Sequence, residues 1–185
     1  MHEGDREGAG GAVRGSERSA VMMLGVVVER RAVDHPWQKW GWRAVSLIPG
    51  AAPVAEWRLL RHDGECARYH AATLPLEIHR TDTEAYKYNL SGRPAVYVVM
   101  RETEDGTFPW QPVELTVSPW DAQAHNETAE DRIEVVPMPE PVIAWLKDFV
   151  DRHHVDRPFL KRRRKGRDRA PHESAEFVPL NRERG

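Results

Sequence analysis

The residues with the clearest chemical meaning form a basic run near the C-terminus. It consists of Lys161, Arg162, Arg163, Arg164 and Lys165. Such a run can neutralise nucleic-acid phosphates or dock onto an acidic protein surface, and it can also act only as a solubilising tail. Residues 1–156 contain 17 basic and 25 acidic residues. This acidic part would repel a nucleic-acid duplex, so the charge distribution favours a protein partner over RNA or DNA.

An apolar segment follows the basic run. In an otherwise polar stretch it contains Phe177, Val178 and Leu180. We expect residues 161–185 to form a flexible basic tail. We expect the run Lys161–Lys165 and these three apolar residues to be the contacts with a protein partner.

Three tryptophans lie close together, interleaved with proline and basic residues. They are Trp37, Trp40 and Trp42. Indoles at this spacing can form an aromatic face for stacking or for peptide binding. A small barrel also needs bulky rings to fill its end, and we favour this packing interpretation. The aromatic face stays open as the alternative.

Two pairs of histidines are candidates for metal binding, but their predicted positions do not favour it. His153 and His154 are adjacent on a predicted helix, where they point about 100° apart and do not converge on one ion. A role for this pair at the helix end, where positive charge is favourable, is preferred. His70 and His79 can face each other across paired strands, but the sequence places no third ligand beside them. We therefore expect no metal and no cofactor.

The usual catalytic and nucleotide-binding patterns are absent from the sequence. It contains no G-x-S-x-G elbow, no phosphate-binding G-x-x-x-x-G-K-[ST], no dinucleotide fingerprint and no H-E-x-x-H. Cys66 is the single cysteine, which excludes an intramolecular disulfide and a thiolate zinc cluster. It has no evident activating base, so a structural thiol is favoured. We expect no catalytic residues and a role in binding.

Short apolar or alternating segments indicate about eight strands. They lie at residues 24–30, 43–48, 56–61, 67–72, 76–80, 95–101, 113–117 and 132–136. Asp63-Gly64 is a hairpin-turn signal between two of them. Short strands joined by glycine, proline and aspartate turns predict a mainly β (α+β) fold, as a small barrel or a curled antiparallel sheet.

Two helices are predicted beside the strands. A short one follows Thr81, which we expect to cap it together with Glu84, and it ends near Gly92. The longer one covers residues 140–153. Its apolar residues recur at i, i+3, i+4 and i+7, and Pro141 suits its first turn. We expect its apolar face to pack against the sheet.

The predicted organisation is one β-rich domain over residues 22–160, between a disordered segment 1–20 and the basic tail. Residues 1–20 are glycine-rich and lack aromatic residues. No apolar run approaches the roughly 20 residues of a membrane helix, and the N-terminus does not have the pattern of a signal peptide. We expect a cytoplasmic protein without membrane insertion.

Several phrases of the sequence resemble a known family. They are LGVVVERR at 24–31, YHAATL at 69–74, TEAY at 83–86, PAVYVV at 94–99, VPMPE at 136–140 and DFVDRHHV at 148–155. Together they resemble an uncharacterised bacterial family, a domain of unknown function, whose genes often sit beside molybdenum-dependent formate dehydrogenase genes. The resemblance covers roughly residues 24–165 and supplies no functional residues.

The resemblance implies a noncatalytic accessory protein or small subunit associated with a molybdenum- or tungsten-dependent formate dehydrogenase. The implied partner is the large subunit of that enzyme or one of its maturation proteins. Two alternatives from other classes stay open. One is a nucleic-acid-binding module that uses Lys161–Lys165, and the other is a small-ligand-binding β-barrel lined by Trp37, Trp40 and Trp42.

Overall fold

The computed structural model describes residues 14–15, 18–126 and 131–155. The chain divides into two units, residues 1–155 and 156–185, and every described residue belongs to the first. Its elements are β1 (Arg14–Gly15), β2 (Ser19–Ala32), β3 (Trp40–Pro49), β4 (Arg58–Asp63), β5 (Cys66–His79), the 3-10 helix η1 (Arg80–Asp82), α1 (Thr83–Ser91), β6 (Ala95–Glu102), β7 (Trp110–Thr116), α2 (Pro119–Asn126), β8 (Asp131–Pro137) and α3 (Glu140–His153).

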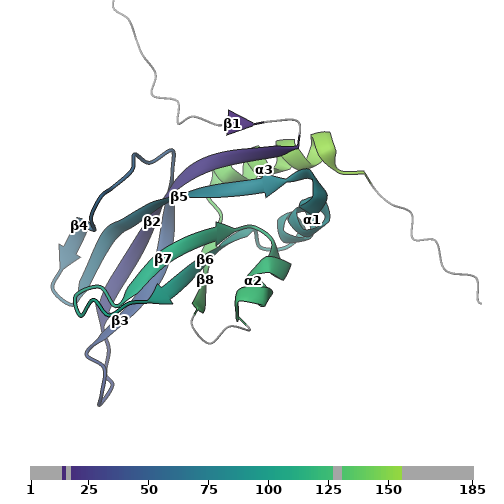
Figure 1. Cartoon of the computed structure of the whole chain (residues 1–185). Helices are drawn as coiled ribbons and strands as arrows, with labels where there is room; N and C mark the ends of the chain where they lie inside the picture. Colours follow the sequence, from purple (N-terminus) through teal and green to yellow (C-terminus); the bar gives the residue numbers. More distant parts are fainter. Residues whose placement is uncertain (1–13, 16–17, 127–130, 156–185) are drawn as a thin grey trace, which may run out of the picture. The chain divides into compact units, whose positions relative to one another are not determined.

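The fold is mainly β, as predicted, with eight strands in one curled, nearly closed sheet (Figure 1). The strands follow the order β1-β2-β5-β7-β6-β8, with β3 beside β2 and β4 beside β5. The pairs are antiparallel except that β5 meets β7 in parallel, at Leu76 and Leu115. This one parallel pair departs from the antiparallel pairing of the other strands. The chain passes through η1, α1 and β6 before it returns in β7, and this connection permits a parallel neighbour.

Strands β2 and β5 are longer than the sequence pattern predicts. Each has 14 residues, and the two pair along almost their whole length. The sequence pattern predicted two strands here, at 67–72 and 76–80, and Pro75, which has no N–H for a ladder, lies between them. Pro75 nevertheless pairs with Met23. On the other edge of β5, β4 pairs only as far as His70 and β7 meets Leu76, so the proline falls in the gap between them.

The start of β2 lies inside the segment predicted to be disordered. Ser19 pairs with His79, the short strand β1 pairs with β2, and Ala20 is buried in the core. The prediction of disorder for residues 1–20 is therefore wrong at its C-terminal end. Composition could not reveal this, because the ladder to a distant strand holds these residues and no local apolar pattern does.

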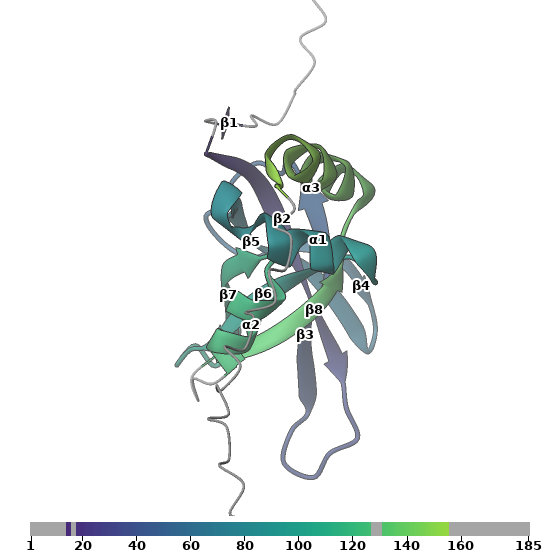
Figure 2. The same cartoon turned by 90° about the vertical axis from the view of Figure 1, so that its right-hand side faces the viewer.

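Four irregularities in strand register curl the sheet. Two lie beside Val27 of β2, between Val27 and Val28 where it pairs with β3 and between Val26 and Val27 where it pairs with β5. The others lie between Leu59 and Arg61 of β4 and beside Val99 of β6. An extra residue in one strand bends that strand and increases its twist. The curled sheet brings β3 next to β8 (Figure 2).

Side chains join β3 to β8 across this seam. The Nη2 of Arg132 donates a hydrogen bond to the carbonyl oxygen of Trp42 at 2.6 Å. The same guanidinium lies over the ring of Trp110, 4.2 Å from its centroid, and its Nε is 3.1 Å from a carboxylate oxygen of Glu134. Glu134 also lies 3.7 Å from the Nε of Arg43. We call these contacts the β3–β8 seam.

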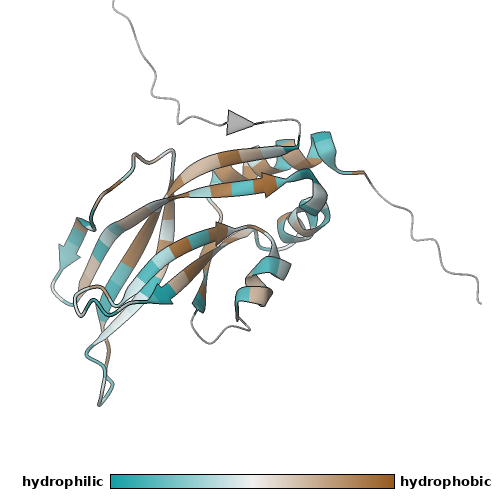
Figure 3. Ribbon diagram, viewed as in Figure 1, coloured by the Kyte–Doolittle hydropathy of each residue, from teal (hydrophilic) through white to brown (hydrophobic). Residues whose placement is uncertain are grey.

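Helix α3 occupies the residues predicted for the long helix. Val142, Leu146, Phe149 and Val150 are its buried residues, and they join the same core cluster as the inward side chains of the sheet. Along the strands, hydrophobic and hydrophilic residues form bands of alternating colour (Figure 3). None of the helices among the described residues is long and apolar enough to cross a membrane.

The two shorter helices differ from the prediction. Helix α1 begins at Thr83 after the 3-10 turn and not directly after Thr81, and its N-cap, Asp82, makes no side-chain capping bond. Gly92 is its C-cap, as predicted. Helix α2 was not predicted, although Ser118 and Pro119 are a typical helix start. The Oγ of Ser118 accepts a hydrogen bond from the backbone N–H of Asp121 at 3.2 Å.

Candidate functional site

The predicted partner-binding residues lie outside the described residues. They are Lys161, Arg162, Arg163, Arg164, Lys165, Phe177, Val178 and Leu180. Their role therefore stays a prediction. The described part of the chain contains other candidate binding sites.

The three tryptophans of the alternative aromatic face, Trp37, Trp40 and Trp42, do not share one surface. Trp42 is 7% exposed and belongs to the core, whereas Trp37 is 92% exposed in the connection between β2 and β3. Trp40 is half-buried, and the guanidinium of Arg30 lies 4.4 Å from its ring centroid. Only Trp37 of the three is freely available to a partner, and Trp42 has the packing role that we favoured.

Aromatic rings fill the interior around Trp42. The rings of Trp57 and Phe108 stack with centroids 4.3 Å apart. Trp42 meets both of them edge to face at 5.9 Å, and Tyr69 packs against all three. Rings at these distances are in direct contact. This end of the barrel is therefore built as a packed core.

The histidine pairs have structural contacts. The ring of His153 lies against Phe149 with centroids 4.6 Å apart, and Nδ1 of His154 is 3.1 Å from Oγ1 of Thr83. His70 and His79 both belong to β5. The expectation that they face each other across paired strands is wrong, because it rested on dividing β5 in two. The described residues contain no cluster of three or more histidine, cysteine, aspartate or glutamate side chains that could hold a metal ion.

Strand β4 is exposed along its whole length. Each residue of Arg58–Asp63 is exposed, and among the described strands β4 pairs only with β5. The strand is held by its hairpin, in which Gly64 takes the first loop position with a φ of 71°. Leu59 and Leu60 are 55% and 45% exposed. The outer edge of β4 therefore presents backbone groups together with two leucines, which is suitable for an extended partner segment.

A polar cleft of about 250 Å³ opens beside the β4–β5 hairpin. Its lining residues are Arg31, Arg61, Asp63, Cys66 and Arg68. We call it the arginine cleft. The register of β2 with β5 places Arg31 opposite Cys66, and it places Glu29 opposite Arg68. The alternation of side chains along each strand then brings these four residues to one face of the sheet.

Glu29 holds two of the three arginines. Its Oε1 accepts a hydrogen bond from Nε of Arg31 at 3.0 Å, and its Oε2 accepts one from Nε of Arg68 at 2.8 Å. Burial disfavours the charged carboxylate, but the two guanidinium contacts outweigh burial and lower the pKa of Glu29 below its ordinary value. The third arginine, Arg61, pairs with Asp63 at 3.3 Å.

Cys66 is a weak nucleophile in this setting. Burial, followed by the hydrogen bond and charge of Glu29, raises the pKa of the Cys66 thiol. A reactive cysteine requires the opposite shift, because the thiolate is the attacking species. The nearest arginine contact, from Nη2 of Arg31 to Sγ, is 3.9 Å long. The geometry supports a neutral thiol in the wall of the cleft.

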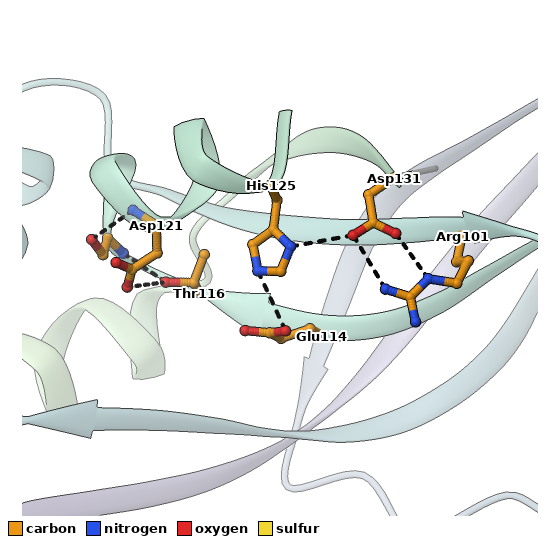
Figure 4. A network of polar contacts seen from close by, with 7 residues as sticks. Arg101, Glu114, Thr116, Asp121, His125 and Asp131 are labelled. Atoms are coloured by element: carbon orange, nitrogen blue, oxygen red, sulfur yellow. Dashed lines mark hydrogen bonds and ion pairs between the residues drawn. The ribbon is translucent and has the colours of Figure 1, made fainter. Parts of the chain in front are cut away.

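A second polar network links α2 to β6, β7 and β8 (Figure 4). Nε and Nη2 of Arg101 donate hydrogen bonds to the two carboxylate oxygens of Asp131 at 2.9 and 3.2 Å. The ring of His125 lies between two acids, with Nδ1 3.3 Å from Asp131 and Nε2 3.4 Å from Glu114. The hydrogen bonds from Arg101 lower the pKa of Asp131 against the effect of burial, and His125 contributes in the same direction.

This network is suited to holding α2 against the sheet. Both ring nitrogens of His125 contact carboxylates of the protein itself. Neither network is evident from the sequence alone. Arg101 and Asp131 are direct cross-strand partners, as are Glu29 and Arg68. The alternating charges were visible in the sequence, but the register that joins them was not.

Comparison with known proteins bears on the family. The model of the family described as "Protein of unknown function (DUF3305)" matches residues 23–164, which is most of the chain. No curated protein matches the chain, and no solved structure does. The match includes every element from β3 to α3 and β2 from residue 23 onward. The chain therefore belongs to this family of proteins of unknown function.

Proposed function

We propose that this protein is a noncatalytic accessory protein or small subunit of a molybdenum- or tungsten-dependent formate dehydrogenase. It acts in the cytoplasm by binding the large subunit or a maturation protein of that enzyme. The identity of the partner rests on the sequence resemblance, since genes that sit together often serve one complex. The family match supports membership of a family and carries no statement about a partner.

The structural observation that supports a binding role is strand β4. An open strand edge is usually short, charged or covered, because it can otherwise pair with another chain. β4 has charged residues at Arg58, Arg61 and Asp63, but it also exposes Leu59 and Leu60. An extended partner segment can hydrogen-bond to the backbone of β4 while apolar side chains cover the two leucines.

The test is a gentle affinity purification of the tagged protein from its native host, grown with formate, molybdenum and tungsten. Mass spectrometry of the recovered proteins is the measurement. Formate dehydrogenase chains in fixed ratio to the tagged protein indicate a subunit, and smaller amounts indicate a maturation helper. If no such chain is recovered, the proposal fails. Nucleic acid in its place would favour the alternative that uses Lys161–Lys165.

A paired variant tests the contact surface. Replacing Leu59 and Leu60 by aspartate puts charge on β4, and we expect recovery of the partner to fall by about tenfold or more, because interface anchors commonly exceed 1.4 kcal/mol. Val135→Asp is the matched control, since Val135 is also an exposed apolar residue in a strand. Deleting residues 161–185 tests the tail separately. If only this deletion reduces recovery, the contact lies in the tail and not on β4.

A further inference from the structure

The arginine cleft carries positive charge that the fold does not neutralise. Three guanidinium groups meet two carboxylates, those of Glu29 and Asp63, in the described ion pairs. One positive charge is therefore in excess at this place. Cys66 does not offset it, because its thiol is held in the neutral form.

The arginines are also positioned before any ligand binds. Arg31 and Arg68 both use Nε to reach Glu29, whose side chain is 10% exposed and so is itself held in place. Their terminal Nη groups are the nitrogens that form forked hydrogen bonds with carboxylates and phosphates. Of these, the described contacts occupy only Nη2 of Arg31, in its long contact with Cys66. Donors that are fixed in advance lose less entropy when they bind.

The size of the cleft limits the ligand. About 250 Å³ is several times the roughly 30 Å³ that a water molecule takes up in the liquid. It lies below the range of roughly 300–1,000 Å³ that is typical of sites for drug-sized ligands. An ion or a compact metabolite fits this volume.

We propose that the arginine cleft binds the oxyanion group, a phosphate or a carboxylate, of a small molecule. Arg31 and Arg68 contact the anion with their Nη groups, and Arg61 closes the site from β4. The site lies on the outer face of the sheet and is distinct from the tryptophan-lined interior. It requires no protein partner, so it stands or falls independently of an association with formate dehydrogenase.

Cys66 provides a built-in probe of this site. It lines the cleft, and it is the single cysteine of the chain. The experiment measures the rate at which N-ethylmaleimide labels the folded, full-length protein. Inorganic phosphate or acetate is titrated from micromolar to millimolar, with chloride added to keep the ionic strength constant. A bound anion blocks the cleft and further disfavours the thiolate, so we expect labelling to slow several-fold and to reach a plateau.

The two anions separate the two ligand chemistries. Protection by phosphate alone assigns a phosphate group, protection by acetate alone assigns a carboxylate, and protection by both assigns a general oxyanion site. If neither anion slows labelling, or if the effect rises without a plateau, the proposal is overturned. The plateau excludes a general salt effect on the stability of the protein.

Arg61→Gln and Arg58→Gln form a matched pair. Both arginines are exposed on β4, but only Arg61 lines the cleft. We expect Arg61→Gln to weaken protection about tenfold in concentration, which is the size of a hydrogen bond to a charged group, and Arg58→Gln to leave it unchanged. For each variant, the anion concentration that gives half-maximal protection is determined relative to that variant's own labelling rate without anion, because removing a charge also alters this rate. Equal weakening in both variants would mean non-specific attraction and would overturn the assignment.

Discussion

At Gly25 the outer face of the sheet has no room for a side chain. A Cβ built there would lie 2.6 Å from Nε2 of His70 and 2.8 Å from Cβ of Ala51. His70 cannot easily move away, because it is buried and its Nε2 lies 3.0 Å from Oγ1 of Thr73. Thr73 donates its own proton to the carbonyl of Ala52 at 2.8 Å, so His70 must carry the proton on Nε2.

We therefore expect Gly25→Ala to lower the free energy of unfolding by about 1–3 kcal/mol, the usual cost of overpacking. Urea denaturation of the two proteins measures the difference. Gly106→Ala is the control, because a Cβ at Gly106 meets nothing within 4 Å. A loss of similar size in both variants would show that the close approach to His70 is not the cause.

At the scale of single residues, sequence patterns reveal burial more readily than partners. The packing of Trp42 was the favoured interpretation before its neighbours were known, since a barrel needs large rings in its interior. Glu29 was visible as an acid in an apolar strand. Its bonds to Arg31 and Arg68 depend on a strand register that local sequence does not determine.

At the scale of elements, the best-predicted one is the most self-contained. Helix α3 has its apolar spacing, Pro141 near its start and basic residues in its last turn, all within 14 residues. The prediction divided strand β5 into two short strands. Pro75 fits within the single long strand because neither β4 nor β7 pairs with β5 at that residue. Helix α2 had a readable start at Ser118 and Pro119 but lacks a strong apolar stripe, so periodicity did not reveal it.

The β3–β8 seam gives a prediction at this scale. Arg132→Gln removes the hydrogen bond to the carbonyl of Trp42 and the stacking on Trp110. A hydrogen bond to a charged group contributes about 1.5–3 kcal/mol. We expect amide hydrogens of β3 and β8 to exchange about tenfold faster or more, since 1.4 kcal/mol is tenfold. The β2–β5 ladder should keep its protection.

Arg43→Gln is the control for the seam. Arg43 pairs with the same Glu134, but it is 76% exposed in its side chain and the pair is 3.7 Å long. Exposed ion pairs contribute little, so this variant should exchange nearly as the parent does. If Arg132→Gln leaves β3 and β8 as protected as Arg43→Gln does, the seam does not depend on Arg132.

At the scale of the whole molecule, two carboxylates among the described residues contribute to stability in acid. Glu29 ties β2 to β5, and Asp131 ties β8 to β6 and α2, and both have lowered pKa values. In mild acid the unfolded chain takes up their protons before the folded chain does. Their contribution is complete above the ordinary pKa values of 4.5 and 3.8, and it is lost as the pH falls through the lowered ones.

Urea midpoints measured from neutral pH downward test this acid limit. The urea midpoint of the parent protein should decrease once the pH is lowered below about 4.5. Glu29→Gln should be less stable at neutral pH, and its urea midpoint should decrease less steeply on acidification. Glu104→Gln, at an exposed loop residue, is the control and should follow the parent. An unchanged slope in Glu29→Gln would remove Glu29 from the explanation.

At alkaline pH, the stability of the folded protein depends in part on a buried tyrosine, Tyr86. Burial raises the pKa of Tyr86 to about 12, and its hydroxyl oxygen accepts a hydrogen bond from the backbone N–H of His79 at 3.1 Å. The unfolded tyrosine ionises near its ordinary value of 10, so stability is complete below that pH and declines as the pH rises toward 12. The full decline is about 2 kcal/mol once solvent screening is allowed for.

Tyr86→Phe should be less stable at neutral pH, because it leaves the N–H of His79 without that acceptor, but its urea midpoint should decline less between pH 10 and 12. Tyr88→Phe removes an exposed hydroxyl from the same helix and is the control, which should decline as steeply as the parent. Burial of Tyr97 also raises its pKa, so part of the decline persists in both variants, and the difference between them isolates the contribution of Tyr86.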